Sequence, residues 1–200
     1  MILIICILVL FLVSGCSLAS GDEGKADSYA LLLEEAQKGD AKAQLKMALA
    51  YDEGLDGVAQ DHTEAARWYR LAAEQGLPEA QNNLGVLYKD GQGVEQDYSE
   101  AARWFLMAAE QGNVLAQSNL GWLCQTGHGV EKDYDAARKW YLLAACKGHA
   151  AAQNNLAVMY RDSLGVAVAI DSARYWFRQA ANKGLPMARR NLDKLDDSDE

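Results

Sequence analysis

The chain has 200 residues, half of them hydrophobic, with 17 glycines and only two prolines. Its formal net charge is −9 and its pI is about 4.8. This balance argues against nucleic acid as a partner, because phosphates require a basic surface, and against electrostatic adhesion to anionic lipid. Scarce proline and abundant alanine favour long helices.

The first 13 residues are almost wholly apolar. A run of this length is too short to cross a bilayer, which needs about 20 apolar residues, and it matches the apolar core of a secretory signal. Secretory signals normally open with Lys or Arg, whereas no charged residue precedes Asp22. A start codon assigned too far downstream would explain the difference, and an uncleaved hydrophobic tail is the alternative interpretation.

The apolar run ends in VSGC at residues 13–16, which resembles the lipobox of bacterial lipoproteins. The resemblance implies a signal peptide over residues 1–15 and a lipid on the sulfur of Cys16, which anchors firmly because more than one acyl chain is attached. Ser17 at the next position implies sorting to the outer membrane if the host has two membranes. We therefore expect a periplasmic, lipid-anchored protein in which residues 16–27 comprise the lipidated cysteine and a flexible tether.

The remainder of the chain repeats itself about every 36 residues. Each copy carries a Trp, then an Ala-Ala pair four residues later, then a closing Gly; the tryptophans are Trp68, Trp104, Trp140 and Trp176. A fixed period in this range indicates a stack of supersecondary units rather than a globular domain with one central pocket. The predicted repeats are 40–76, 77–112, 113–148 and 149–184.

Each repeat has the pattern of two antiparallel helices, as residues 77–112 illustrate. Pro78 suits the first turn of a helix, and glycine in the sequence DGQG permits the left-handed backbone that ends it. A second helix begins at Asp97, which forms a capping box with Glu100. The expected buried stripes are Ala80, Leu84, Leu87 and Tyr88 on the first helix and Ala101, Trp104, Phe105, Ala108 and Ala109 on the second.

Single helices over residues 28–38 and 186–195 are predicted to cap the two ends of the stack. The fold class is therefore all-α, with a solenoid spanning residues 28–195. The last five residues, 196–200, are predicted to be a frayed acidic tail.

The repeated pattern resembles the Sel1-like repeat, a relative of the tetratricopeptide repeat. In the second repeat the resemblance is carried by Ala80, Leu84, Gly85, Tyr88, Gly91, Gly93, Val94, Asp97, Ala101, Trp104, Phe105, Ala108, Ala109 and Gly112. It implies a right-handed α-solenoid that serves as a protein-interaction scaffold. Some family members were described as cysteine-rich β-lactam-binding proteins with paired cysteines between units, and this chain lacks those pairs.

Two cysteines, Cys124 and Cys146, lie within the predicted solenoid. They fall at opposite poles of a helical hairpin, roughly 15–20 Å apart at the helical rise. This separation exceeds the limit of about 7 Å between the Cα atoms of a disulfide. We expect both cysteines to be small packing residues.

Patterns that suggest catalysis or cofactor binding each have a simpler explanation. The sequences GQG and GHG look like phosphate loops, but neither follows a strand or precedes a Lys-Ser/Thr pair. His62, His128 and His149 lack metal-ligand spacing and are expected at the surface, and the serines lack a nucleophile elbow. The sequence therefore predicts no enzyme, no cofactor, no metal and no small-molecule substrate.

Exposed positions that vary between repeats are expected to select the partner of a solenoid, since constant positions pack the core. Three such columns lie on the first helices, on the face that lines the concave side in this family. The candidate partner-binding residues are Asn82, Val86, Lys89, Ser118, Trp122, Gln125, Asn154, Val158 and Arg161. Trp122 has aliphatic neighbours in its column, which favours an exposed hot spot; packing against the next helix is the alternative.

Three functional hypotheses follow. The first is a non-catalytic, membrane-anchored protein-binding scaffold of the bacterial envelope, and most specifically an immunity protein that covers the active site of a toxic effector such as a phospholipase. Small Sel1-like lipoproteins with that role occur in the wider family. An adaptor for envelope assembly, secretion or signalling is the alternative, and an enzyme acting on β-lactams or peptidoglycan ranks third.

Overall fold

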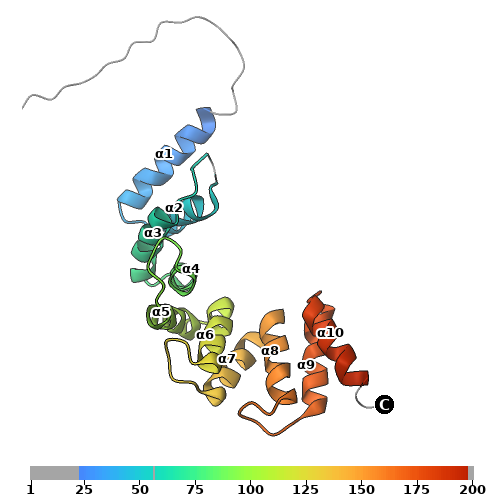
Figure 1. Cartoon of the computed structure of the whole chain (residues 1–200). Helices are drawn as coiled ribbons and strands as arrows, with labels where there is room; N and C mark the ends of the chain where they lie inside the picture. The colour runs from blue at the N-terminus through green and yellow to red at the C-terminus, as the bar shows by residue number, and fades with distance from the viewer. Residues whose placement is uncertain (1–22, 56, 198–200) are drawn as a thin grey trace, which may run out of the picture.

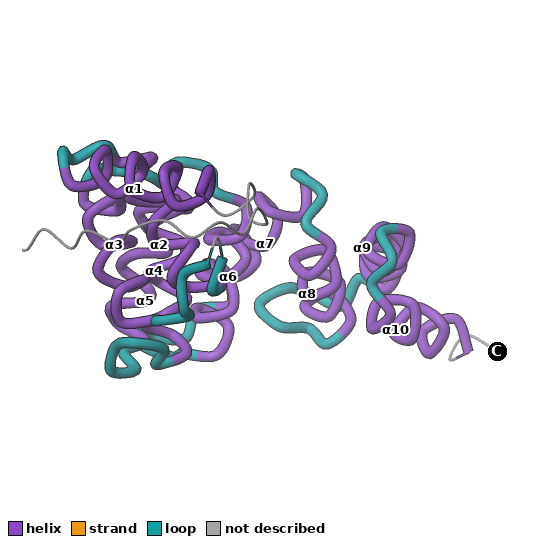
Figure 2. The backbone as a smooth tube through the Cα atoms, turned by 90° about the horizontal axis from the view of Figure 1, so that it is seen from above, coloured by secondary structure: helices purple, strands orange, loops and turns teal. Residues whose placement is uncertain are grey.

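The computed structural model describes residues 23–55 and 57–197, which contain ten α-helices and no strand. The helices are α1 (Glu23–Gln37), α2 (Ala41–Glu53), α3 (His62–Glu74), α4 (Pro78–Asp90), α5 (Tyr98–Glu110), α6 (Val114–Thr126), α7 (Tyr134–Cys146), α8 (Ala150–Arg161), α9 (Ile170–Asn182) and α10 (Pro186–Asp197). Figure 1 shows them stacked in chain order along a curved path. Figure 2, seen from above, shows that short loops join them. The expected all-α solenoid is confirmed.

Each repeat is a helical hairpin, and the four hairpins are α2–α3, α4–α5, α6–α7 and α8–α9. The end helices pack where the sequence predicts them, α1 against α2 and α10 against α9. Both run past their predicted bounds. Helix α1 begins at Glu23, inside the segment expected to be tether, and α10 ends at Asp197, inside the expected acidic tail.

The predicted signal peptide and Cys16 lie outside the described residues, as do residues 198–200. Within the described part, no helix combines the length and the apolar character needed to cross a bilayer.

The second helix of each of the first three repeats begins at an aspartate that caps it. The Asp97 carboxylate accepts hydrogen bonds from the backbone N–H groups of Ser99 (2.8 Å) and Glu100 (3.1 Å). Glu100 does not complete the predicted capping box, because its carboxylate instead pairs with Arg103 at 2.7 Å. Only half of the capping box is therefore formed, while the predicted helix start is correct.

The two helices of a repeat approach closely because small residues face large ones. An added Cβ on Gly85 of α4 would lie 2.7 Å from the ring of Phe105 on α5, which is fully buried. Gly121 and Tyr141 repeat this contact at 2.8 Å. All the stripe residues predicted for the second repeat are buried except Tyr88, which is half-buried and whose hydroxyl accepts a hydrogen bond from Arg70.

Successive repeats are joined by backbone contacts that the sequence pattern does not reveal. Gly93, with φ +67°, lies against the start of α3, and an added Cβ would come within 2.2 Å of the His62 carbonyl carbon. Gly129 lies in the same way on Tyr98 at the start of α5. A buried glutamine adds a second link, since Gln81 Nε2 donates to the Ala73 carbonyl at 3.1 Å. The same bond recurs from Gln44, Gln117 and Gln153.

Candidate protein-interaction surface

The first predicted binding column is buried rather than exposed. Asn82, Ser118 and Asn154 are 3%, 8% and 4% exposed, so the expectation that this column faces solvent is wrong. The amide oxygens of Asn82 and Asn154 each accept a hydrogen bond from the next unit of the stack. Asn119 donates to Asn82 Oδ1 at 3.2 Å, and Asn191 of α10 donates to Asn154 Oδ1 at 3.0 Å. A buried amide requires such partners, and the next repeat supplies them.

The other two predicted columns are partly exposed. They comprise Val86, Trp122 and Val158, and Lys89, Gln125 and Arg161, and we call these six residues the variable face. The polar members are held in place within the chain: Gln125 accepts a hydrogen bond from the Tyr141 hydroxyl at 2.8 Å, and Lys89 pairs with Asp90 at 2.9 Å. Arg161 pairs with the adjacent Asp162. Binding of a partner by this face stays a prediction.

Trp122 packs within the chain, where it lies half-buried against a core cluster that includes residues of α7 and α8. Its ring stacks on His128 of its own loop, with centroids 5.2 Å apart and planes 3° from parallel. Tyr98, at the start of the preceding repeat's α5, lies 6.3 Å from Trp122 and 4.9 Å from His128. His128 is exposed, as expected. The cluster fixes the indole ring, so Trp122 would contact a partner at little cost in side-chain entropy.

A column of asparagines beside the variable face was missed by sequence reasoning. It contains Asn83, Asn119, Asn155 and Asn191, each half-buried, and its signal is an asparagine at a spacing of 36 residues. Asn83 Nδ2 donates to the hydroxyl of Tyr69 at 3.2 Å, and this hydroxyl donates to Asp52 Oδ2 at 3.0 Å. Burial, and secondarily the Asp52 carboxylate, raises the pKa of Tyr69. The hydroxyl therefore stays protonated and available as a donor.

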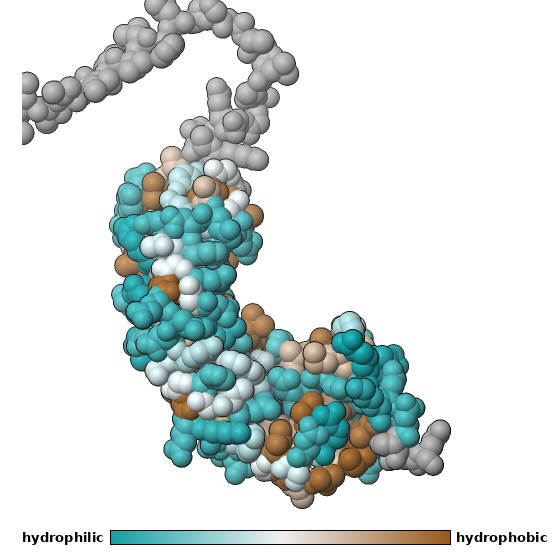
Figure 3. Space-filling view, in the orientation of Figure 1, coloured by the Kyte–Doolittle hydropathy of each residue, from teal (hydrophilic) through white to brown (hydrophobic). Residues whose placement is uncertain are grey.

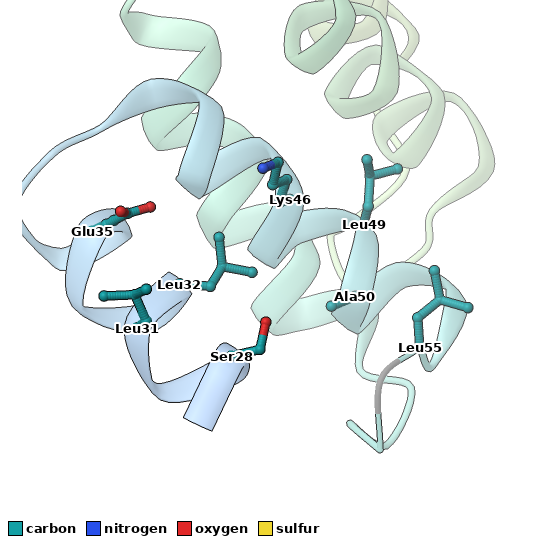
Figure 4. Close-up of a pocket in the computed structure, with 8 residues that line it drawn as sticks. All are labelled: Ser28, Leu31, Leu32, Glu35, Lys46, Leu49, Ala50 and Leu55. Carbon is teal, nitrogen blue, oxygen red and sulfur yellow. The ribbon is translucent and has the colours of Figure 1, made fainter. Parts of the chain in front are cut away.

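An open groove of about 430 Å³ lies between α1 and α2 (Figure 4). Its lining is mainly aliphatic, with Leu31 and Leu55 among the exposed large hydrophobic residues. The charged groups in the lining are Glu35 and Lys46. The lining holds one carboxylate, one ammonium group and the hydroxyl of Ser28. This arrangement matches no pair of nucleophile and general base.

The two cysteines of the solenoid are both free thiols. Cys124 is buried, as expected of a packing residue, and burial together with the nearby Asp133 raises the pKa of its thiol. Cys146 is exposed, so the expectation that it packs in the core is wrong. It is the last residue of α7. Across the residues that the structure describes, no three His, Cys, Asp or Glu side chains gather in a way that could hold a metal ion.

All four repeats match the family model of the Sel1 repeat, over residues 41–77, 78–113, 114–149 and 150–185. The chain belongs to the Sel1 repeat family. Members of this family are generally protein-binding scaffolds, and the extended stack seen here fits that use. The matched boundaries lie one residue after those predicted from the closing glycines.

Two solved structures are similar in sequence and fold. A Sel1 repeat protein from Oxalobacter formigenes is 32% identical with a TM-score of 0.76, over 85% of this chain and 70% of that one. A protective antigen of uropathogenic Escherichia coli with an SLR fold is 33% identical with a TM-score of 0.68, over 84% of this chain and 43% of that one.

A plant protein shares part of the sequence. An ERAD-associated E3 ubiquitin-protein ligase component of Arabidopsis thaliana, HRD3A, is 38% identical over 65 residues, which are 32% of this chain and 10% of the plant protein. The chain therefore covers a small part of that relative's length and less than half of the E. coli antigen's.

Proposed function

We propose that the chain is a non-catalytic scaffold of the bacterial envelope, anchored through a lipid on Cys16, that binds and neutralises a toxic antibacterial effector. The observation that carries the proposal is the variable face. Its positions recur in register through three repeats, while the side chains change from Val86 and Lys89 in the second repeat to Trp122 and Gln125 in the third. A surface that keeps its geometry and varies its chemistry is suited to recognising one protein partner.

Neutralisation by covering an active site requires shape and contact, and no reacting group of the inhibitor itself. The variable face supplies an aromatic anchor in Trp122, whose ring is already oriented by His128 and Tyr98. Tryptophan is enriched among residues that dominate interface energies. Because Trp122 lies on α6, near the middle of the series of helices, it would contact the middle of a bound partner.

The alternative is an adaptor that assembles envelope or secretion components. The match to HRD3A favours it, because that protein is a component of a ligase. An adaptor would hold two or more proteins at once along the stack. An immunity protein would hold one, in a complex of equal stoichiometry.

The test uses the full-length chain, purified in mild detergent, as bait for proteins secreted by competing strains. The matched control is Trp122→Val, because valine occupies the same position in the second and fourth repeats as Val86 and Val158. Capture of one toxic enzyme, inhibited at a one-to-one ratio and released by the Trp122→Val variant, would support immunity. Capture of several envelope proteins with no inhibited activity would support the adaptor and refute immunity.

A further inference from the structure

The loop of the fourth repeat departs from the loops before it. Residues 162–169 read DSLGVAVA, where the second and third repeats have DGQGVEQD and TGHGVEKD. The backbone nevertheless follows the same path, since the Ala169 N–H donates to the Tyr160 carbonyl as Asp97 N–H donates to Tyr88. The change is therefore confined to the side chains, which are almost all apolar in the fourth repeat.

Three stabilising features of the loop of the second repeat are missing here. The helix-capping aspartate is replaced by Ala169, which makes no side-chain cap. Ser163 holds a φ of +58° where the other repeats have glycine, a conformation that is strained for a residue with a side chain. Val168 stands where Gln96 donates to the Lys89 carbonyl at 2.8 Å. Departures from local rules that coincide in one segment are expected at functional sites.

The result is an exposed hydrophobic loop. Val168 is 58% exposed, and Leu164 and Val166 are partly exposed beside it. Figure 3 shows hydrophobic surface gathered along the lower edge of the molecule, under α8 and α9, where this loop lies. Isolated exposed aliphatic residues are ordinary, whereas a contiguous group with a polar border marks an interaction site.

An acidic groove of about 540 Å³ borders the hydrophobic loop. Gly165 of the loop forms one wall, and the third repeat forms the other with Glu131, Asp133 and Asp135. One cation, Lys132, also lines the groove, and its ammonium group lies over the Tyr134 ring at 4.8 Å from the centroid. Asp135 also pairs with Arg138 at 3.3 Å, so three carboxylates stand against two cations, and the groove keeps a net negative charge directly beside apolar surface.

We propose that residues 162–169 and this groove together form a docking surface for a protein segment that carries apolar side chains next to Lys or Arg. The apolar side chains would cover Leu164 and Val168, and the basic group would enter the groove toward Glu131 and Asp135. The proposal rests on the proposed role as a protein-binding scaffold, and it adds a second contact surface at the loop edge of the stack. The acidic border disfavours anionic lipid, and it disfavours a second copy of this chain because two such borders would face each other.

The test uses a variant that removes the apolar surface and is expected to increase the free energy of unfolding. Replacing residues 162–169 with DGQGVEQD restores the aspartate cap, the glycine and the glutamine, so this loop-exchange variant is expected to unfold at higher urea concentration than the wild type. Loss of binding by the variant would then not be attributable to unfolding. Glu131→Gln combined with Asp135→Asn tests the groove separately from the loop.

The partner segment is identified by photo-crosslinking in the intact host. Benzoylphenylalanine is placed at position 168 of the full-length chain and, as the matched control, at position 96 in the second repeat. The crosslinked peptide is sequenced by mass spectrometry and synthesised. We expect position 168, and not position 96, to capture a basic and apolar peptide. The synthesised peptide should bind the loop-exchange variant at least tenfold more weakly than the wild-type full-length chain. It should also bind the Glu131→Gln, Asp135→Asn variant more weakly, with an affinity that depends less on salt.

Four outcomes would overturn the proposal: equal binding of the peptide to the loop-exchange variant, crosslinks to a second copy, crosslinks to phospholipid, or the same yield from position 96. The immunity proposal fails independently. If position 168 captures a basic and apolar segment of a protein that is not a toxic enzyme, and the toxin-capture experiment recovers no inhibited enzyme, the docking surface stands and immunity is refuted. If a toxin is neutralised equally well by the loop-exchange variant, and position 168 captures no basic and apolar segment, immunity stands and this surface is refuted.

Discussion

The glycine contact between repeats gives a quantitative test of what holds the stack together. Gly93 and Gly57 occupy the same position in the second and first repeats, and both have positive φ angles, +67° and +82°. They differ in their surroundings. An added Cβ on Gly93 would lie 2.2 Å from the His62 carbonyl carbon, whereas a Cβ on Gly57 would have no described atom within 4 Å apart from its chain neighbours.

The two alanine variants therefore share one cost and differ in another. Alanine with a left-handed backbone costs about 1–2 kcal/mol in either repeat. In Gly93→Ala the loop must also move away from α3 by about 1 Å, to restore an ordinary contact distance, and overpacking of this kind costs about 1–3 kcal/mol. We expect Gly57→Ala to lower the free energy of unfolding by about 1–2 kcal/mol and Gly93→Ala by about 2–5 kcal/mol.

The assay is urea unfolding followed by far-UV circular dichroism, with both variants compared to the wild type under one condition. Stability in a repeat protein is approximately a sum of repeat and interface terms, so a weakened interface is also expected to reduce the m-value as the first repeat unfolds separately. Equal losses for Gly57→Ala and Gly93→Ala, within about 0.5 kcal/mol, would refute the claim that this backbone contact couples the repeats. Gly129→Ala, which faces the same close contact with Tyr98, should behave like Gly93→Ala.

Three further predictions concern single side chains. Burial lowers the pKa of His149, so the folded state favours the neutral imidazole. The contribution of His149 to the free energy of unfolding is therefore fully present above the ordinary histidine pKa of about 6.5, and it is lost as pH falls below that value. His149→Asn should remove that part of the pH dependence of the urea midpoint and add a helix cap like that of Asn113, raising stability by about 1 kcal/mol; a variant that keeps the wild-type slope would contradict this. Cys146 should react with a thiol reagent at pH 8 in the folded protein, while the buried Cys124, whose pKa is raised, should react only on unfolding; simultaneous reaction would contradict the assigned burial. Cys16→Ala should abolish incorporation of labelled palmitate and release the chain from membranes, and labelling that persists would exclude Cys16 as the lipid site.

The elements of the fold were predictable because they depend on local signals. Asp97 marks the start of α5 and Gly91 the end of α4, and both act within a few residues of the chain. The apolar stripe of α5 follows from helical periodicity alone. Helix α1 was placed too late because its first turn, beginning at Glu23, carries small and polar residues that are also typical of a tether.

The candidate site was less predictable because it depends on contacts between repeats. Asn82, Val86 and Lys89 share one side of α4 by spacing, yet Asn82 is covered by the next repeat and the other two are not. Periodicity shows which positions recur but not how closely adjacent first helices approach. The half-formed capping box has a local cause, since Glu100 pairs with Arg103 three residues further along the same helix.

The loop of the fourth repeat carries more functional information than the repeated geometry around it. Positions that obey the repeat pattern are accounted for by the stability of the stack, so their identity says little about a partner. At residues 162–169 the pattern is broken in the direction that weakens the fold, with a cap and a glycine both absent. Because the second and third repeats show that this backbone accepts Glu, Gln or Lys, and Asp at the positions of residues 167–169, the folded structure does not require the apolar residues there. Their presence is best explained by contact with something outside the chain, and the loop-exchange variant separates that contact from the fold.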